Sequence, residues 1–148
     1  MRTPPETKTA LAADLLSAVA RINRLATQLV GLELPYAQAR LLSTIDDQGA
    51  ARISDLAMLD HCSQPTMTSQ VRRLEDAGLV SRTADPADGR AVLISITPKG
   101  VATLARVRAN RSAAIDPYLE RLDKADRQTL VDAIRVMHSI LDGAQRPR

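Results

Sequence analysis

The chain has 148 residues, the length of a single domain that buries roughly 68–70% of the surface exposed by its unfolded form. It has 20 basic and 17 acidic residues, a formal charge of +3, and 17 of the basic residues are arginines, which suit bidentate contacts with phosphates and guanine edges. A single cysteine excludes an intrachain disulfide framework, and no stretch predicts a signal peptide or a membrane span. We therefore expect one α-rich, cytoplasmic domain whose core, without Phe or Trp, is aliphatic.

Two amphipathic helices are predicted in the first fifty residues. Apolar residues recur at spacings of three and four from Leu11 to Leu29, which is typical of a helix with one apolar stripe, and Gly31 ends it. Pro35 begins a second, shorter helix, which stops at the turn-forming residues 46–49.

Two short helices joined by a tight turn are predicted between residues 54 and 77. Ser54 is the expected N-cap of the first, whose apolar face extends over barely two turns. Ser63 is the expected N-cap of the second, Pro65 lies in its first turn, and Gly78 takes the C′ position that follows its end. This pattern predicts a helix-turn-helix.

A β-hairpin and two long helices are predicted in the rest of the chain. Residues 79–83 and 91–97 favour strands, and the run between them is rich in turn-forming residues. The helices are expected from 98 to about 121 and from Asp123 onward. The predicted fold class is mainly α with a small β-hairpin.

The second helix of a helix-turn-helix enters the major groove, and the residues near its N-terminus reach the base edges. In this sequence those residues are small and polar, a choice that folding does not require. Glutamine can pair bidentately with adenine, hydroxyl groups can contact phosphates or bases, and a threonine methyl can contact the thymine methyl. The expected major-groove residues are Ser63, Gln64, Pro65, Thr66, Thr68, Ser69, Arg72 and Arg73.

The hairpin carries the second group of expected DNA contacts. Arg90 follows the tight Asp88-Gly89 turn, where an arginine can enter the narrow minor groove while the nearby carboxylate holds it. Arg82 on the preceding strand is expected to contact a phosphate. Residues 52–91 contain five basic and six acidic side chains, so a basic surface must come from their arrangement.

Several motifs follow one another across this region. They are Leu56-Ala57, Gln64-Pro65-Thr66-Met67-Thr68, Val71-x-Arg73-Leu74-Glu75-x-Ala77-Gly78-Leu79-Val80-x-Arg82, Asp85-x-x-Asp88-x-Arg90 and Thr97-x-x-Gly100. Together they resemble the winged helix-turn-helix of the MarR family of bacterial regulators. The flanking helices agree in number and order, so the resemblance extends over one domain with a winged core at about 35–98 and dimerisation helices at about 9–31 and 98–144.

The resemblance implies a homodimer that binds a palindromic operator in double-stranded DNA, usually as a repressor, and is released by a small phenolic or anionic ligand. The long apolar stripes of the terminal helices favour a dimer independently, because the short elements between them cannot cover these stripes. Arg72 and Ser69 depart from the family pattern, in which an acidic residue and an arginine are common at these positions. The operator sequence therefore cannot be inferred from the family.

Two other function classes remain open. A winged helix can also serve as a protein-interaction module, which the near-neutral charge of residues 52–91 permits. A small-molecule binding protein or an enzyme is the other alternative, but the sequence offers no pair of nucleophile and base. We expect no catalytic site, cofactor or metal, and interpret His138 and Asp142, four residues apart, as a surface pair.

Five further residues admit both a structural and a functional interpretation. Cys62 is interpreted as a buried structural thiol rather than a redox sensor. Arg106, Arg108 and Arg111 are interpreted as a solvated basic face, with anion binding or a phosphate contact as the alternative. Tyr36 either lines the ligand pocket implied by the resemblance or belongs to the core.

Overall fold

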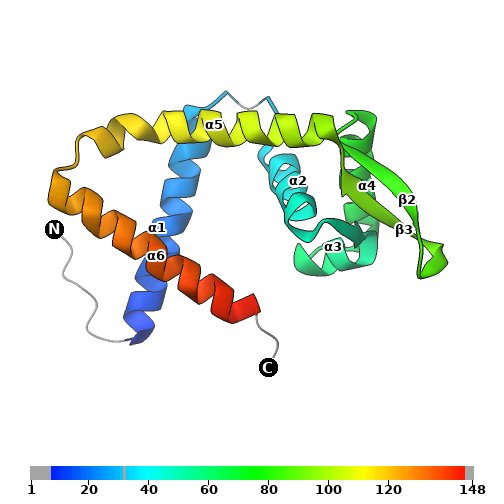
Figure 1. Ribbon diagram of the computed structural model, residues 1–148, viewed down its shortest axis with the longest axis horizontal. Coiled ribbons are helices and arrows are strands. Elements are labelled where there is room, and N and C mark those ends of the chain that lie inside the picture. The colour runs from blue at the N-terminus through cyan, green and yellow to red at the C-terminus, as the bar shows by residue number, and fades with distance from the viewer. Residues whose placement is uncertain (1–7, 32, 146–148) are drawn as a thin grey trace. The chain divides into compact units, whose positions relative to one another are not determined.

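The structure is a computed structural model, and it describes residues 8–31 and 33–145. In chain order the elements are α1 (Lys8–Leu29), α2 (Tyr36–Gln48), β1 (Ala50–Arg52), α3 (Ile53–Leu59), α4 (Gln64–Asp76), β2 (Val80–Asp85), β3 (Asp88–Ile96), α5 (Pro98–Glu120) and α6 (Lys124–Gln145) (Figure 1). The chain consists of two compact units, one up to Arg111 and one from Ser112 onward. The predicted fold class, mainly α with a small β-hairpin, is confirmed.

The helix-turn-helix consists of α3 and α4. Ser63 caps α4 as predicted, since its Oγ accepts a hydrogen bond from the Thr66 N–H at 3.3 Å, and Pro65 lies in the first turn. The predicted cap at Ser54 is wrong. Arg52 occupies the N-cap position of α3 without a side-chain cap bond, because the helix continues directly from the last residue of strand β1.

Both helices of this motif end in the same geometry. The second residue after each helix has a positive φ, 74° at Gly78 and 50° at His61. The residue that follows it donates back to the helix in both cases, from the Leu79 N–H to the Leu74 carbonyl at 2.9 Å and from the Cys62 N–H to the Ala57 carbonyl at 3.0 Å. These bonds satisfy carbonyls that a helix end otherwise leaves unpaired, so the turn between α3 and α4 has a defined path.

The sheet has three antiparallel strands in the order β1-β3-β2. Strands β2 and β3 form the predicted hairpin, hereafter the wing, and their pairing runs to Asp85 opposite Asp88. The strands therefore continue further towards the tip than expected, leaving a turn of two residues. Strand β1 was not predicted, because its Ala-Ala-Arg sequence has no preference for strands. It forms by pairing Ala51 with Ile94 on the free edge of β3.

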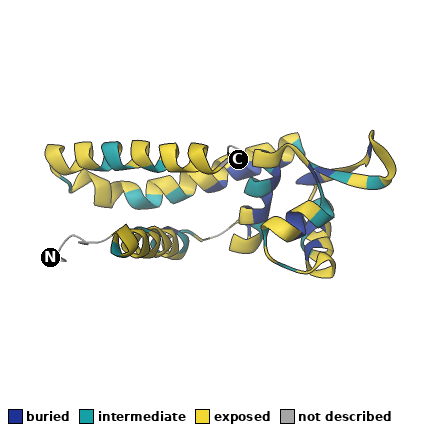
Figure 2. Cartoon of the chain, turned by 90° about the horizontal axis from the view of Figure 1, so that it is seen from below, coloured by how far each residue is buried: buried dark blue, intermediate teal, exposed yellow. Residues whose placement is uncertain are grey.

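One aliphatic core supports the helix-turn-helix and the wing. It is drawn from α2, α3, α4, the sheet and the first turns of α5, within the unit that ends at Arg111 (Figure 2). Its fully buried large side chains are Leu42, Ile45, Leu56, Met67, Leu74, Ile94 and Val71. Because α4 and β3 both contribute to it, α4 and the wing share one packed support.

Helices α1 and α6 stand outside this core. Ala26 is the buried residue of α1, and no described residue of α6 is buried. Their exposed large apolar side chains are Leu11, Leu16, Val19, Ile22 and Leu29 on α1, and Val131, Ile134, Val136, Ile140 and Leu141 on α6. Within residues 8–31 and 33–145, no helix combines the length and the hydropathy that crossing a bilayer requires.

Candidate nucleic-acid interface

The polar face of α4 lies at the protein surface. Met67, Val71 and Leu74 point into the core, so the opposite side of the helix faces solvent. All eight residues expected to face the major groove, from Ser63 to Arg73, are exposed.

Hydrogen bonds divide these exposed residues into two groups. The Ser63 and Thr66 hydroxyls bond to each other at 2.8 Å, and the Thr68 hydroxyl donates to the Gln64 carbonyl at 2.9 Å. The hydroxyl groups of these three residues are therefore already hydrogen-bonded within the first turns of α4. Four side chains make no hydrogen bond or ion pair within the described part of the chain: Gln64, Ser69, Arg72 and Arg73.

Ion pairs distribute the charge of this region unevenly. Three of the six acidic groups in residues 52–91 are neutralised, Asp60 by Arg40, Glu75 by Arg82 and Asp85 by Arg52. Among the residues that the structure describes, no carboxylate lies within ion-pair distance of Arg72, Arg73 or Arg90. Among the described residues, the three arginines of this region without an ion pair thus lie on α4 and at the wing tip, where Asp76 and Asp88 are also without an ion pair, and the region as a whole is not basic.

Arg82 has a partner inside the protein. Its Nε donates to Glu75 Oε2 at 2.7 Å, and both side chains are about one-third exposed. This ion pair joins the start of the wing to the last turn of α4. A phosphate contact by Arg82, as expected from the sequence, would have to compete with Glu75.

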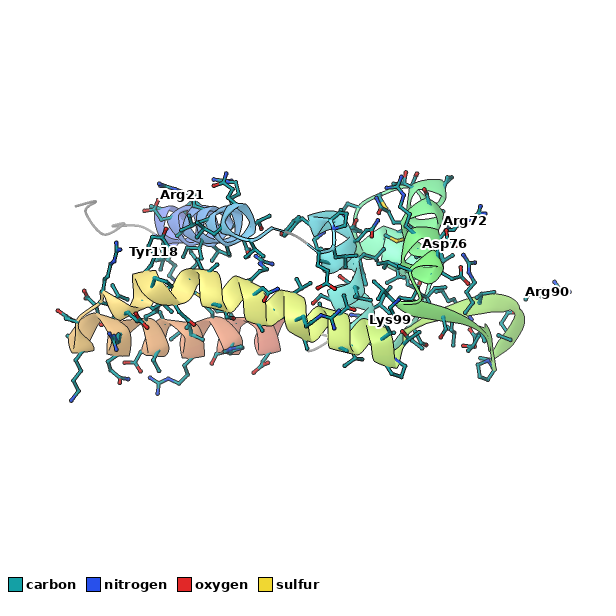
Figure 3. All side chains as sticks on the ribbon, turned by 90° about the horizontal axis from the view of Figure 1, so that it is seen from above. Arg21, Arg72, Asp76, Arg90, Lys99 and Tyr118 are labelled. Carbon is teal, nitrogen blue, oxygen red and sulfur yellow. The ribbon has the colours of Figure 1, made fainter. Side chains whose placement is uncertain are left out.

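The wing tip differs from the prediction in one detail. Asp88 was expected to hold the Arg90 guanidinium, but its Oδ1 accepts the backbone N–H of Arg90 at 3.1 Å. The carboxylate therefore shapes the turn and leaves the guanidinium free. Figure 3 shows the Arg90 side chain beyond the tip of the wing, and the Arg72 side chain extending from α4 on the side towards which the wing projects.

A buried carboxylate holds the base of this turn. Asp85 Oδ1 accepts the Ala87 N–H at 2.9 Å, and Oδ2 accepts Arg52 Nε at 2.9 Å. The hydrogen bond from Ala87, followed by the one from Arg52, lowers the pKa of Asp85. Asp85 thus connects the wing turn to strand β1, a role that the Asp85-x-x-Asp88-x-Arg90 motif contained but that its spacing did not reveal.

The wing is expected to lose this support in acid. A carboxylate whose pKa is lower in the folded protein stabilises the fold above its unfolded pKa, and the contribution is lost as the pH falls through the folded value, below about 4. The urea midpoint of the wild type should therefore fall more steeply below pH 4 than that of Asp85→Asn. Asp47→Asn, at an exposed carboxylate, is the control and should follow the wild type. Parallel curves for the wild type and Asp85→Asn would contradict this role.

The junction between α4 and α5 fixes the end of the recognition helix. Thr97 Oγ1 donates to the Gly78 carbonyl at 2.7 Å, and Lys99 Nζ donates to the Ala77 carbonyl at 2.8 Å. The Gly100 N–H in turn donates to Thr97 Oγ1 at 3.0 Å. The Thr97-x-x-Gly100 motif therefore attaches the first turn of α5 to the two residues that follow α4.

The arginines of α5 are solvated at Arg106 and Arg108, whose side chains are more than half exposed, and Arg111 is partly buried. Each donates to a side chain outside α5: Arg106 to Glu33 at 2.8 Å, Arg108 to Ser43 at 3.0 Å and Arg111 to Asn23 at 2.8 Å. These contacts join α5 to α1, to α2 and to the segment between them. Sequence periodicity cannot show them, because the partners are more than sixty residues away.

Tyr36 lines a surface cavity and is not part of the core. Its side chain is half-exposed, and the Arg111 guanidinium lies 5.8 Å from the centroid of its ring. The cavity has a volume of about 180 Å³ and is lined by Tyr36, Ala39, Arg40, Ser43, Leu104, Val107, Arg108 and Arg111. Three arginines and a phenol ring thus meet an aliphatic floor.

Two other candidate sites from the sequence are Cys62 and the pair of His138 and Asp142. Cys62 is half-buried and packs against the core, so it contributes apolar surface. His138 and Asp142 are both exposed on α6. In the described ranges, no three His, Cys, Asp or Glu side chains gather closely enough to hold a metal ion.

Comparisons with known proteins agree with this geometry. The model of the MarR family matches residues 34–92. The HTH-type transcriptional regulator Mb0904 of Mycobacterium bovis is 31% identical over 133 residues, which cover 89% of this chain and 93% of the relative.

Solved structures are similar over nearly the whole chain. The transcriptional regulator Tm0710 of Thermotoga maritima is 25% identical, with a TM-score of 0.75 over 95% of this chain and all of that one. BpsR of Bordetella bronchiseptica, whose DNA binding is regulated by 6-hydroxynicotinic acid, is 27% identical, with a TM-score of 0.57 over 93% of this chain and 97% of its own. The similarity thus includes the helices on both sides of the helix-turn-helix.

Proposed function

Because the chain belongs to the MarR family of DNA-binding transcriptional regulators, which are not enzymes, we propose that it represses transcription by binding a palindromic operator as a homodimer in the cytoplasm. The observation that carries this proposal is the free positive charge of Arg72, Arg73 and Arg90, which lies on the two elements that a winged helix presents to DNA. Neighbouring arginines are neutralised inside the protein, so these three remain available for phosphates and base edges.

The exposed apolar surface of the terminal helices supports the homodimer. Several large apolar side chains on α1 and α6 have more than half of their surface exposed, among them Leu16 at 70% and Val136 at 57%. In a monomer this exposure to water would cost solvation free energy, whereas a second copy can cover both helices. A twofold dimer would place two recognition helices about one turn of duplex apart, which matches a palindromic site.

Selection from a random pool of duplex DNA tests the proposed function. The full-length protein should enrich an inverted repeat whose half-sites are centred about 10 base pairs, or a multiple of one helical turn, apart. A protein-interaction module would retain no duplex above background. Enrichment of a single, non-repeated site would contradict the twofold arrangement.

Arg90→Ala is expected to weaken binding to every duplex sequence. The Arg90 guanidinium is free at the wing tip, and a lost phosphate contact lowers the slope of log K against log salt by about one unit for each subunit. Titrations of labelled operator at several salt concentrations measure this slope. The control is Arg82→Ala, which should cost stability because it breaks the Glu75 pair. An unchanged slope for Arg90→Ala would contradict the wing contact.

The proposal includes release from DNA by a small aromatic anion. The cavity at Tyr36 offers one aromatic ring and the guanidinium groups of Arg108 and Arg111, which suit a ring that carries a carboxylate. Regulation of a relative by 6-hydroxynicotinic acid supports the same ligand class. Benzoate and 6-hydroxynicotinate should each raise the melting temperature and reduce operator binding, and Arg111→Ala should weaken both effects.

A further inference from the structure

The orientation of α4 determines which side chain occupies the middle of its outward face. The helix has 3.6 residues per turn, and its buried residues define the inward direction. The centre of the opposite face then falls on Ser69 and Asp76, which are both exposed. Arg72 and Arg73 flank this line, each about 50° from it and on opposite sides. Arg72 extends on the side towards which the wing projects (Figure 3). Arg72 is therefore the long outward side chain of α4 on the side of the wing.

Arg72 has the freedom that base reading requires. In the part of the chain that the structure describes, its guanidinium makes no ion pair, not even with Asp76 one turn further on. Figure 3 shows it extended away from α4. Ser69, one turn earlier and nearer the outward line, is short and lets the helix approach the floor of the groove. The planar guanidinium group of Arg72 can donate two parallel hydrogen bonds, which suits the adjacent O6 and N7 acceptors of guanine.

Thr68 adds a second, apolar contact next to Arg72. Its hydroxyl is occupied by the Gln64 carbonyl at 2.9 Å, so its methyl group is the part left for DNA. Thr68 and Arg72 are four residues apart, about 6 Å along the helix axis. This distance is close to the rise of two base pairs, which is about 3.4 Å each. A thymine methyl contacted by Thr68 should therefore lie within about two base pairs of the base read by Arg72.

We infer that Arg72 is the main specificity-determining residue of this chain, and that it reads one guanine in each half-site through bidentate hydrogen bonds to O6 and N7. A thymine within two base pairs of that guanine contacts the Thr68 methyl. Arg73, on the other side of the outward line from Arg72, contacts phosphate instead. This inference rests on the proposed function, because it names the DNA sequence that the proposed interface recognises.

Selection from random duplex DNA with three proteins provides the first test. The wild type should enrich half-sites that contain an invariant guanine with a nearby thymine. Arg72→Ala should accept any base at the guanine position and bind the wild-type operator roughly ten- to a hundredfold more weakly. Arg73→Ala is the matched control, since it removes a neighbouring exposed arginine but should keep the guanine and weaken binding to all sequences alike.

Modified bases locate the contact on the base itself. Replacing the guanine with 7-deazaguanine removes the N7 acceptor and should weaken wild-type binding roughly three- to tenfold, but leave Arg72→Ala unchanged. Inosine, which lacks only the minor-groove amino group, is the control base and should be neutral. Equal melting temperatures of the three proteins would show that each is folded, because Arg72 and Arg73 have no partner among the described residues.

Two different failures can be told apart. If the wild type enriches an inverted repeat but Arg72→Ala keeps the same preferred bases, the inference is overturned and the proposed function stands. Wild-type binding that is insensitive to 7-deazaguanine would also overturn the inference and leave the proposed function intact. If the wild type retains no duplex at all, the proposed function fails and the inference fails with it.

Discussion

Gly100→Ala is expected to destabilise the protein by at least about 3 kcal/mol, the upper range for forcing an extra carbon into a packed site. A Cβ atom at Gly100 would lie 2.1 Å from the Leu79 carbonyl oxygen and 2.7 Å from the Ile96 side chain. The oxygen belongs to the backbone and accepts the Thr97 N–H at 3.0 Å. Relief of the clash would therefore require the first turn of α5 to move away from the end of α4.

Urea denaturation of Gly100→Ala and of a control substitution measures this effect. Gly89→Ala is the control, because a Cβ atom there meets nothing within 4 Å and exposed substitutions usually change stability by less than about 0.5 kcal/mol. We also expect Gly100→Ala to bind operator poorly at temperatures where it is folded, since α4 loses its anchor on α5. Equal midpoints for both variants would contradict the close approach seen at Gly100.

The double substitution Ile134→Glu with Leu141→Glu is expected to separate the proposed homodimer into monomers. Both side chains are exposed on the apolar stripe of α6, and a charge buried against apolar surface costs several kcal/mol. The monomer would hold one half-site at a time, so operator affinity should fall roughly a hundredfold or more through the loss of two-site binding. Light scattering gives the mass, and titration with labelled operator gives the affinity.

Ser139→Glu is the control for this experiment. Ser139 is exposed on α6 but lies on the opposite side from the apolar stripe, so an added charge there should leave the dimer intact. A monomeric wild type, or a double variant that keeps both its mass and its affinity, would refute the proposed assembly.

The order of the helices and the two ends of α4 could be predicted from the sequence. Ser63 and Gly78 act through the backbone of their own segment, so their residue types predict the cap and the C′ position directly. Strand β1 could not be predicted in this way. Its pairing depends on the free edge of β3, more than forty residues later in the chain, and not on the preferences of its own residues.

The sequence predicted which residues form the candidate interface, but it did not predict which of its arginines are bound to other side chains of the protein. Arg72, Arg82, Arg90 and Arg111 look alike in the sequence. The structure pairs Arg82 with Glu75 and places Arg111 against Asn23, whereas Arg72 and Arg90 point to solvent (Figure 3). Which arginines stay free depends on contacts between distant segments, and local periodicity carries no information about these contacts.

The position of Tyr36 beside the arginine-lined cavity gives the protein an intrinsic optical reporter. The sequence has two tyrosines and no tryptophan, so its ultraviolet emission comes from two phenol rings. The other ring, Tyr118, belongs to the unit from Ser112 onward, where Arg121 lies 5.9 Å from its centroid. In a Tyr118→Phe variant the emission would come from Tyr36 alone, and the arrival of a small molecule at its ring could be followed without a label.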